Sequence, residues 1–152
     1  MAITRAELLA FLRSHSLAVQ ASMMPSWPCF PQAAVVGIAV SERFEIVFDT
    51  LESTRKVRNL RTSGRIAFVI GGLTEGDERT VQYEGFVEEP RGEALERAQR
   101  LYFQRFPEGR ERQHSPGIVY FLTRPAWVRY SNCQCDPAEI TEFSAEQLRE
   151  RP

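Results

Sequence analysis

The sequence is poor in the side chains from which metal centres and disulfide frameworks are built. Its 152 residues include three cysteines and two histidines. Cys133 and Cys135 are separated by one residue, too close for a relaxed bridge, and Cys29 offers no second pair that would complete a zinc site. We therefore predict no metal site, and we interpret the cysteines as ordinary thiols.

An excess of one charge and long apolar runs are also missing. The 19 lysine and arginine residues nearly balance 20 aspartate and glutamate residues, which gives a formal net charge of −1. A general nucleic-acid binder has a strongly basic surface, and a membrane helix needs roughly 20 apolar residues. Neither pattern occurs, and residues 1–7 lack a cleavable signal pattern. The sequence thus predicts no nucleic-acid partner, no membrane partner and a cytoplasmic location.

What is present is the composition of an ordinary globular protein, with 43% hydrophobic and 26% charged residues. The length is about that of one domain and is enough to bury a core. We predict a single domain over residues 1–152, with its core at about 4–131 and a C-terminal tail at 132–152.

Local signals predict four helices. A capping-box pattern predicts a helix over residues 4–15. Helical spacing of apolar residues predicts a second helix over 54–61, stopped by Gly64, and a third over 92–106. Ser144 offers a cap for a short terminal helix.

Strands dominate the rest of the chain. The loop at 24–31 contains three prolines, and Pro125 bends the last strand. Strands linked by hairpins point to an antiparallel barrel and an α+β class. The predicted strands are 17–24, 33–40, 43–49, 65–70, 80–88 and 118–130.

The clearest chemistry lies at the start of the second predicted helix. Ser53 or Thr54 caps it, and Arg55 and Lys56 fall in its first turn. Cations there oppose the helix macrodipole, which favours acidic residues by about 0.3–1 kcal/mol. A phosphate would resolve the conflict by accepting backbone N–H groups, a hydroxyl and both cations. The alternative is a solvated basic helix, partly neutralised by Glu52.

This segment resembles part of a known family. A strand ending Phe-x-Thr, then a short loop and Ser/Thr-Arg-Lys opening a helix that continues to Asn-Leu, resembles the phosphate-binding segment of the pyridoxamine 5′-phosphate oxidase-like FMN-binding split barrels. Segments 31–36, 80–85 and 124–130 also have counterparts in that order. The resemblance covers roughly residues 4–130 and implies an α+β fold, an antiparallel split β-barrel with flanking helices.

The sequence departs from the family on the substrate side. The true pyridoxamine-phosphate oxidases have a glutamine where Thr80 aligns, and they end in an Arg-Leu-His-Asp-Arg run that binds the substrate phosphate. Here the corresponding residues 128–132 contain no histidine, and residues 26–31 replace an Asp-Gly turn. The resemblance therefore supports the flavin site rather than the substrate site of the named enzyme.

The resemblance implies a flavin site shared between two copies of the chain. Arg55 and Lys56 would hold the phosphate of FMN. Gln82 would reach the flavin from the neighbouring sheet, and Trp127 and Arg129 would close the site from the partner chain. The other implied cofactor contacts lie on two strands and at the start of the helix: Ala34, Val36, Phe48, Asp49, Thr50 and Thr54.

Three hypotheses for function follow from this resemblance. The first is an FMN-dependent oxidoreductase with a small-molecule substrate or electron donor, in which FMN supplies the redox chemistry and no protein nucleophile is needed. The second is a non-catalytic flavin-binding or flavin-storage module. The third keeps the fold with a deazaflavin or a haem-derived ligand. The sequence assigns no catalytic residue.

Other residues receive simpler interpretations. We interpret Trp27, Cys29 and Phe30 as packing residues rather than pocket lining, and Asp49 as a cap or turn acceptor rather than a general base. Residues 35–40 are apolar throughout, so we expect a second copy of the chain to cover one face of this strand. Helices of the same chain packed over that strand are the competing explanation.

Overall fold

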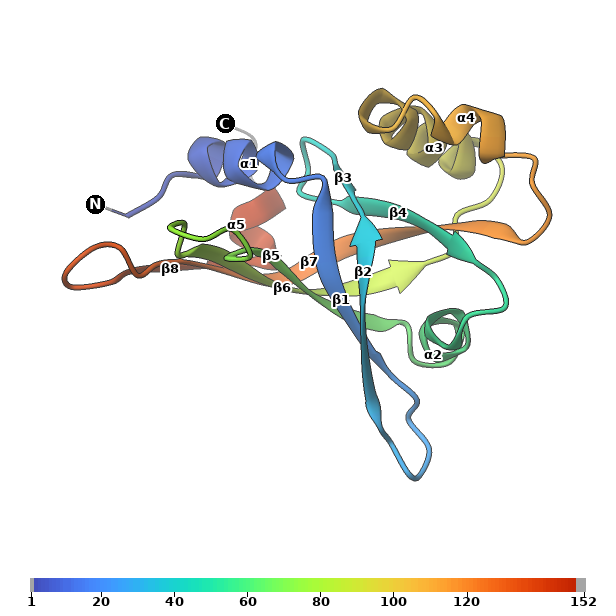
Figure 1. The fold of residues 1–152 in the computed structure, drawn as a ribbon, viewed down its shortest axis with the longest axis horizontal. Coiled ribbons are helices and arrows are strands. Elements are labelled where there is room, and N and C mark those ends of the chain that lie inside the picture. Colours follow the sequence, from blue (N-terminus) through green and yellow to red (C-terminus); the bar gives the residue numbers. More distant parts are fainter. Residues whose placement is uncertain (1, 150–152) are drawn as a thin grey trace.

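The computed structural model describes residues 2–149 as a curled antiparallel sheet with helices at its ends and edges (Figure 1). The helices are α1 (Arg5–Ser14), α2 (Arg55–Ser63), α3 (Glu93–Arg105), α4 (Gly109–Arg112) and α5 (Ala145–Arg149). The strands are β1 (Leu17–Met23), β2 (Pro31–Gly37), β3 (Ala39–Val40), β4 (Ile46–Leu51), β5 (Arg65–Gly71), β6 (Arg79–Glu88), β7 (Ile118–Asn132) and β8 (Glu139–Ser144).

The sheet is a barrel that does not close. Its strand order is β2-β1-β5-β6-β7-β4-β3, and β8 pairs with β7 beside this path. Within the described residues β2 pairs only with β1, and β3 pairs only with β4. The two ends of the curled sheet approach each other where β2 contacts β4. We call this gap between β2 and β4 the split, and the expected α+β antiparallel split barrel is confirmed.

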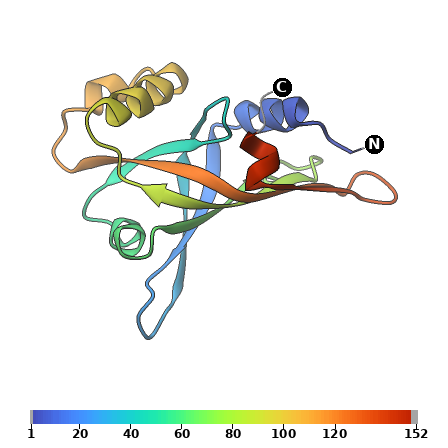
Figure 2. The ribbon, with the colours of Figure 1, turned by 180° about the vertical axis from the view of Figure 1, so that it is seen from behind.

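Side chains that alternate along the strands form two apolar clusters. The larger fills the inside of the barrel and includes Phe48, Phe68 and Tyr83. The smaller lies on the other side of β4 and β7, under α3, and includes Tyr102 and Tyr120. Figure 2 shows α3 and α4 over one end of the sheet and α1 with α5 at the other. Among residues 2–149, no helix is long and apolar enough to cross a membrane.

The predicted helix boundaries are confirmed where a local signal sets them. The Thr4 hydroxyl accepts from the Glu7 N–H and the Glu7 carboxylate accepts from the Thr4 N–H, which is the capping box of α1. Gly64 ends α2 at φ 64°, a left-handed conformation that costs glycine little. Gly92 and Phe106 bound α3.

The predicted strand over 33–40 is wrong as a single element. β2 ends at Gly37 and β3 begins at Ala39, so the chain passes from one edge of the sheet to the other within this run. The helices α1 and α3 pack on β3, which buries Ala39 and Val40 inside one chain. Helices of the same chain, rather than a second copy, therefore cover residues 38–40. Val35 is the one apolar side chain of 35–40 that stays largely exposed.

The predicted C-terminal tail also contains regular structure. β8 adds an antiparallel strand to β7, and α5 follows it as the expected terminal helix. Leu148 of α5 is buried in the main apolar cluster. The described part of the tail, up to residue 149, thus contributes to the core.

A β-bulge makes Gly85 sensitive to substitution. The register between β6 and β7 shifts between Glu84 and Gly85. A Cβ at Gly85 would lie 2.6 Å from the Arg124 carbonyl oxygen, which cannot move away as a side chain could. We expect Gly85→Ala to lower the free energy of unfolding by about 1–3 kcal/mol, the usual cost of overpacking. Urea denaturation measures this, and the exposed control Glu84→Ala should stay within about 0.5 kcal/mol of wild type.

Candidate functional site

Eight of the eleven predicted cofactor contacts line the two sides of the split. Ala34 and Val36 lie on β2, whose outer edge pairs with no strand among the described residues. On the other side, β3 pairs with β4 only as far as Val47, so Phe48 and Thr50 lie where the edge of β4 is free. The helix α2 begins just beyond β4, with Thr54 as its N-cap and Arg55 and Lys56 in its first turn. Unpaired backbone groups on both edges are available to a ligand.

Asp49 is the exception among these residues, because its side chain points away from the split. Its carboxylate accepts a 2.7 Å hydrogen bond from the Tyr102 hydroxyl, under α3. Burial of Tyr102 and this bond both raise the pKa of the tyrosine above its usual value. Asp49 thus anchors α3 to β4, and only its backbone faces the split.

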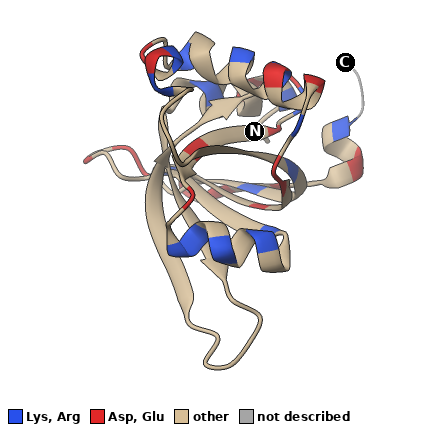
Figure 3. Ribbon diagram, turned by 90° about the vertical axis from the view of Figure 1, so that its right-hand side faces the viewer, with Lys and Arg blue, Asp and Glu red and all other residues tan. Residues whose placement is uncertain are grey.

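The start of α2 has the properties of an anion site. Thr54 is the N-cap residue, but its hydroxyl makes no capping bond, and its Oγ1 is buried without a partner among the described residues. No acidic residue lies in the first turn. In Figure 3, the charged residues of α2 are all basic. The free N–H groups, the hydroxyl and the cations therefore converge at one helix end.

Lys56 and Arg55 occupy this end in different ways. The Lys56 Nζ donates a 3.1 Å hydrogen bond to Thr50 Oγ1, which ties α2 to the end of β4. Partial burial lowers the pKa of Lys56 from its usual value. Arg55 is exposed and forms no salt bridge within residues 2–149. Glu52, the expected neutralising residue, pairs at 2.8 Å with Arg61 in the last turn of the same helix. This pairing neutralises part of the charge of α2, as the alternative of a solvated basic helix expects, but it does not involve the two cations of the first turn.

The inside of the split carries polar side chains that the sequence reasoning missed. Asn59 is buried on α2, and its Nδ2 donates to Ser22 Oγ at 3.3 Å. Along β1 the burial pattern is inverted, because Leu17 and Val19 are on the outer face while Gln20 and Ser22 are buried inside. The alternation of apolar and polar residues was visible in the sequence. Its direction relative to the core was not, since apolar residues are expected inside.

The remaining three predicted contacts lie on the outer face of the sheet. Gln82 and Arg129 are register partners on β6 and β7, and Trp127 lies two residues from Arg129 on the same face. The Arg129 guanidinium is 3.5 Å from the carboxylate of Glu142 on β8. The structure does not bring these residues to the split of their own chain, which places them at the split only if a second copy supplies them.

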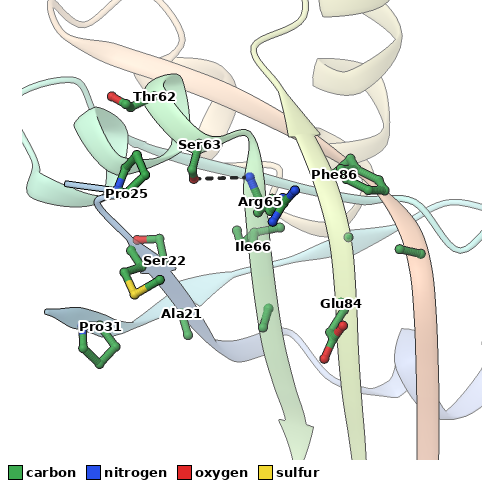
Figure 4. A pocket seen from close by; sticks show the side chains of 14 residues that line it. Ala21, Ser22, Pro25, Pro31, Thr62, Ser63, Arg65, Ile66, Glu84 and Phe86 are labelled. Atoms are coloured by element: carbon green, nitrogen blue, oxygen red, sulfur yellow. Dashed lines mark hydrogen bonds between the residues drawn. The ribbon is translucent and has the colours of Figure 1, made fainter. Parts of the chain in front are cut away.

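A groove of about 800 Å³ is lined by none of the eleven predicted residues. It lies between the β1–β2 hairpin, the end of α2 and the outer face of β5 and β6 (Figure 4). Met23, Pro25 and Phe86 give it a mainly apolar wall.

In the same β1–β2 hairpin, the side chains of Trp27 and Phe30 are 91% and 71% exposed, so their predicted packing role is wrong.

The lowered pKa of Lys56 predicts a pH dependence for anion binding at α2. A bound phosphate favours the ammonium form, so it raises the pKa of Lys56 in the complex. The affinity for the anion is therefore highest at pH values below the pKa of Lys56 in the ligand-free protein, and it falls as the pH rises through that pKa. Because this pKa is lowered, the fall begins below the usual lysine value of about 10.4. Lys56→Arg keeps its charge and should remove the fall. Titrations of FMN from neutral to alkaline pH check this; identical profiles for the two proteins would exclude Lys56.

Comparison with known proteins identifies the architecture. No family model and no curated protein matches the sequence. A haem-binding protein from Mycobacterium smegmatis superposes with a TM-score of 0.80 at 15% identity. The alignment covers 98% of this chain and 61% of that protein, so the chain spans less than two thirds of it. The fold is the split barrel.

Two further split barrels bear the family name that the sequence suggested. A putative pyridoxamine 5′-phosphate oxidase from Listeria innocua has a TM-score of 0.68 at 17% identity, over 83% of this chain and 96% of its own. A pyridoxamine 5′-phosphate oxidase-related, FMN-binding protein from Nostoc punctiforme has a TM-score of 0.63 at 11% identity, over 97% and 94%. The predicted resemblance is therefore confirmed for the split-barrel fold.

Proposed function

We propose that this split barrel binds FMN and acts as an oxidoreductase on a small-molecule substrate or electron donor. The observation that carries the proposal is the start of α2, beside a half-buried Lys56. There, among residues 2–149, Thr54 Oγ1 is buried without a partner and Arg55 forms no salt bridge. These groups fit a terminal phosphate, which accepts several charge-assisted hydrogen bonds at once.

The residues of the split have distinct roles in this proposal. Thr54, Arg55 and Lys56 hold the phosphate, and the bond from Lys56 to Thr50 fixes the ammonium in place. The free edges of β2 and β4, at Ala34 and Phe48, orient the remainder of the ligand and exclude water from one side of it. When bound, FMN supplies the hydride or electron transfer, and the chain supplies no nucleophile.

A haem-derived ligand fits the same residues less well. Haem iron is held by an axial histidine, cysteine, methionine or tyrosine. None of the eight contacts along the split is such a residue. The ring of His15, which follows α1, is hydrogen-bonded to the Phe11 carbonyl at 2.8 Å. The haem-binding neighbour therefore supports the fold, whereas the donors of this chain favour a phosphorylated flavin.

A homodimer completes the proposed site. The outer face of β2, β1 and β5 exposes apolar side chains at Val35, Val19 and Val69, which are register neighbours. A monomer seldom leaves such a face open, and a twofold partner would cover it symmetrically. The Gln82 and Trp127 side chains lie on this same outer face, so a second copy would present them to the split of the first.

Identification of the ligand tests the proposed function. Mass spectrometry of the ligand released from purified or flavin-reconstituted protein should show FMN, because the proposed contacts at the start of α2 bind a terminal phosphate. FAD alone, or no flavin after reconstitution, would contradict the proposal. Anaerobic mixing with NADH or NADPH then separates the hypotheses, because bleaching of the bound flavin favours an oxidoreductase and an unchanged spectrum favours a storage module.

A further inference from the structure

Gln20 is a fully buried amide on β1. Its side chain is 0% exposed, and both Nε2 and Oε1 lack a hydrogen-bond partner among residues 2–149. Most buried polar atoms in proteins have a partner, because an unpaired one loses its bonds to water. An amide that leaves both its donor and its acceptor unpaired therefore points to a group outside the chain.

The register places Gln20 beside the strand that borders the split. Gln20 lies on the inner face of β1, opposite Ala34 of β2 and Phe68 of β5 in the register. One strand, β2, separates it from the split, and the side chain of that strand beside it is the methyl group of the partly exposed Ala34. For a planar group at the free edge of β2 to reach Gln20, it would have to pass this methyl group, the smallest side chain that an L-residue can have.

Polar side chains connect this amide to the start of α2. Ser22 lies two residues from Gln20 on the same face of β1, about 7 Å along the strand. Ser22 accepts a hydrogen bond from Asn59, and Asn59 follows Lys56 by three residues, close to one helical turn. The row Gln20–Ser22–Asn59–Lys56 therefore runs from a buried amide at one end to a cation at the other, which suits an elongated ligand with a polar ring edge and a terminal anion.

We infer that Gln20 binds the pyrimidine edge of the flavin, an inference that rests on the proposed FMN function. A primary amide presents an N–H donor beside a C=O acceptor. Its complement is a ligand edge on which an N–H lies beside a carbonyl. The pyrimidine ring of a flavin or deazaflavin has such an edge, because its N3–H is flanked by two carbonyl groups. A tetrapyrrole directs its nitrogens to the centre of the ring, so Gln20 selects for the flavin class.

The test compares two ligands and three proteins. FMN and N3-methyl-FMN, which lacks the donor, are titrated into wild type, Gln20→Leu and the exposed control Gln104→Leu. We expect wild type and the control to bind FMN roughly ten-fold or more tightly than the methylated analogue. Gln20→Leu should bind the two alike, and should bind FMN about ten-fold less tightly than wild type does.

Thermal unfolding of the ligand-free proteins separates ligand binding from a structural role. An apolar side chain in place of two unpaired polar atoms should leave the midpoint of Gln20→Leu unchanged or raise it. A lower midpoint with unchanged FMN affinity would show that the amide serves the fold and would overturn the inference. If a buried water bonds the Gln20 amide in place of the flavin, wild type should bind both ligands equally. That result would overturn the inference about Gln20 and leave the proposed function intact. Absence of any FMN binding would overturn both.

Discussion

Arg55→Ala combined with Lys56→Ala is expected to weaken FMN binding by at least about 100-fold, because each charge-assisted contact to a phosphate contributes about 1.5–3 kcal/mol. The fold should survive the change, since Arg55 is exposed and Lys56 is only half-buried. Removing two cations from the first turn of α2 also lessens their conflict with the helix dipole. Quenching of flavin fluorescence measures the affinity, and circular dichroism checks the fold.

A matched control separates this effect from a general loss of positive charge. Arg97→Ala with Arg100→Ala removes the same charge from α3, where both side chains are exposed and form only long ion pairs. We expect this control to bind FMN like wild type. Wild-type affinity in the Arg55/Lys56 double variant would place the phosphate elsewhere and leave α2 as a merely basic helix.

The second large effect is on assembly. Val35→Glu combined with Val69→Glu should change the mass in light scattering from near twice 17.4 kDa to 17.4 kDa. Both side chains are exposed in one chain, 60% and 41%, and both flank Val19 in the register. Covering each valine contributes about 1.5–3 kcal/mol to a dimer, and a buried unpaired carboxylate opposes it. The monomer should also lose FMN affinity, because Gln82, Trp127 and Arg129 would no longer reach the split.

Leu73→Glu is the control for this experiment. Leu73 is 71% exposed in the turn between β5 and β6, outside the apolar outer face, so its variant should remain a dimer. Wild-type protein that is monomeric at micromolar concentration and still binds FMN would contradict the shared site. A double variant that stays dimeric would show that the partner uses a different surface.

The parts of the fold that could be predicted are those set by local chemistry. The capping box at Thr4 and the left-handed Gly64 each fix a helix end with a few neighbouring residues. The passage from β2 to β3 at Ile38 could not be predicted, because an apolar run does not encode which edge of a sheet each residue joins. β8 was missed because only Phe143 of its six residues is buried.

The candidate site was predictable to a similar extent. Arg55 and Lys56 were visible because two cations at a helix start conflict with the dipole. Gln20 was not, because a polar residue that alternates with apolar ones along a strand normally faces water. On β1 this rule is inverted at Val19, which lies outside, and at Gln20 and Ser22, which lie inside, whereas Ala18 is buried as expected. The inversion follows if the outer face is covered by a second copy and the inner face by a polar ligand.

The most direct test of the phosphate site is a titration of the ligand-free protein with FMN and with riboflavin, which differ only in the phosphate. The contacts at Thr54, Arg55 and Lys56 should make FMN bind at least about 100-fold more tightly than riboflavin. Equal affinities for the two ligands would contradict the assignment of the split and the start of α2 as the flavin phosphate site.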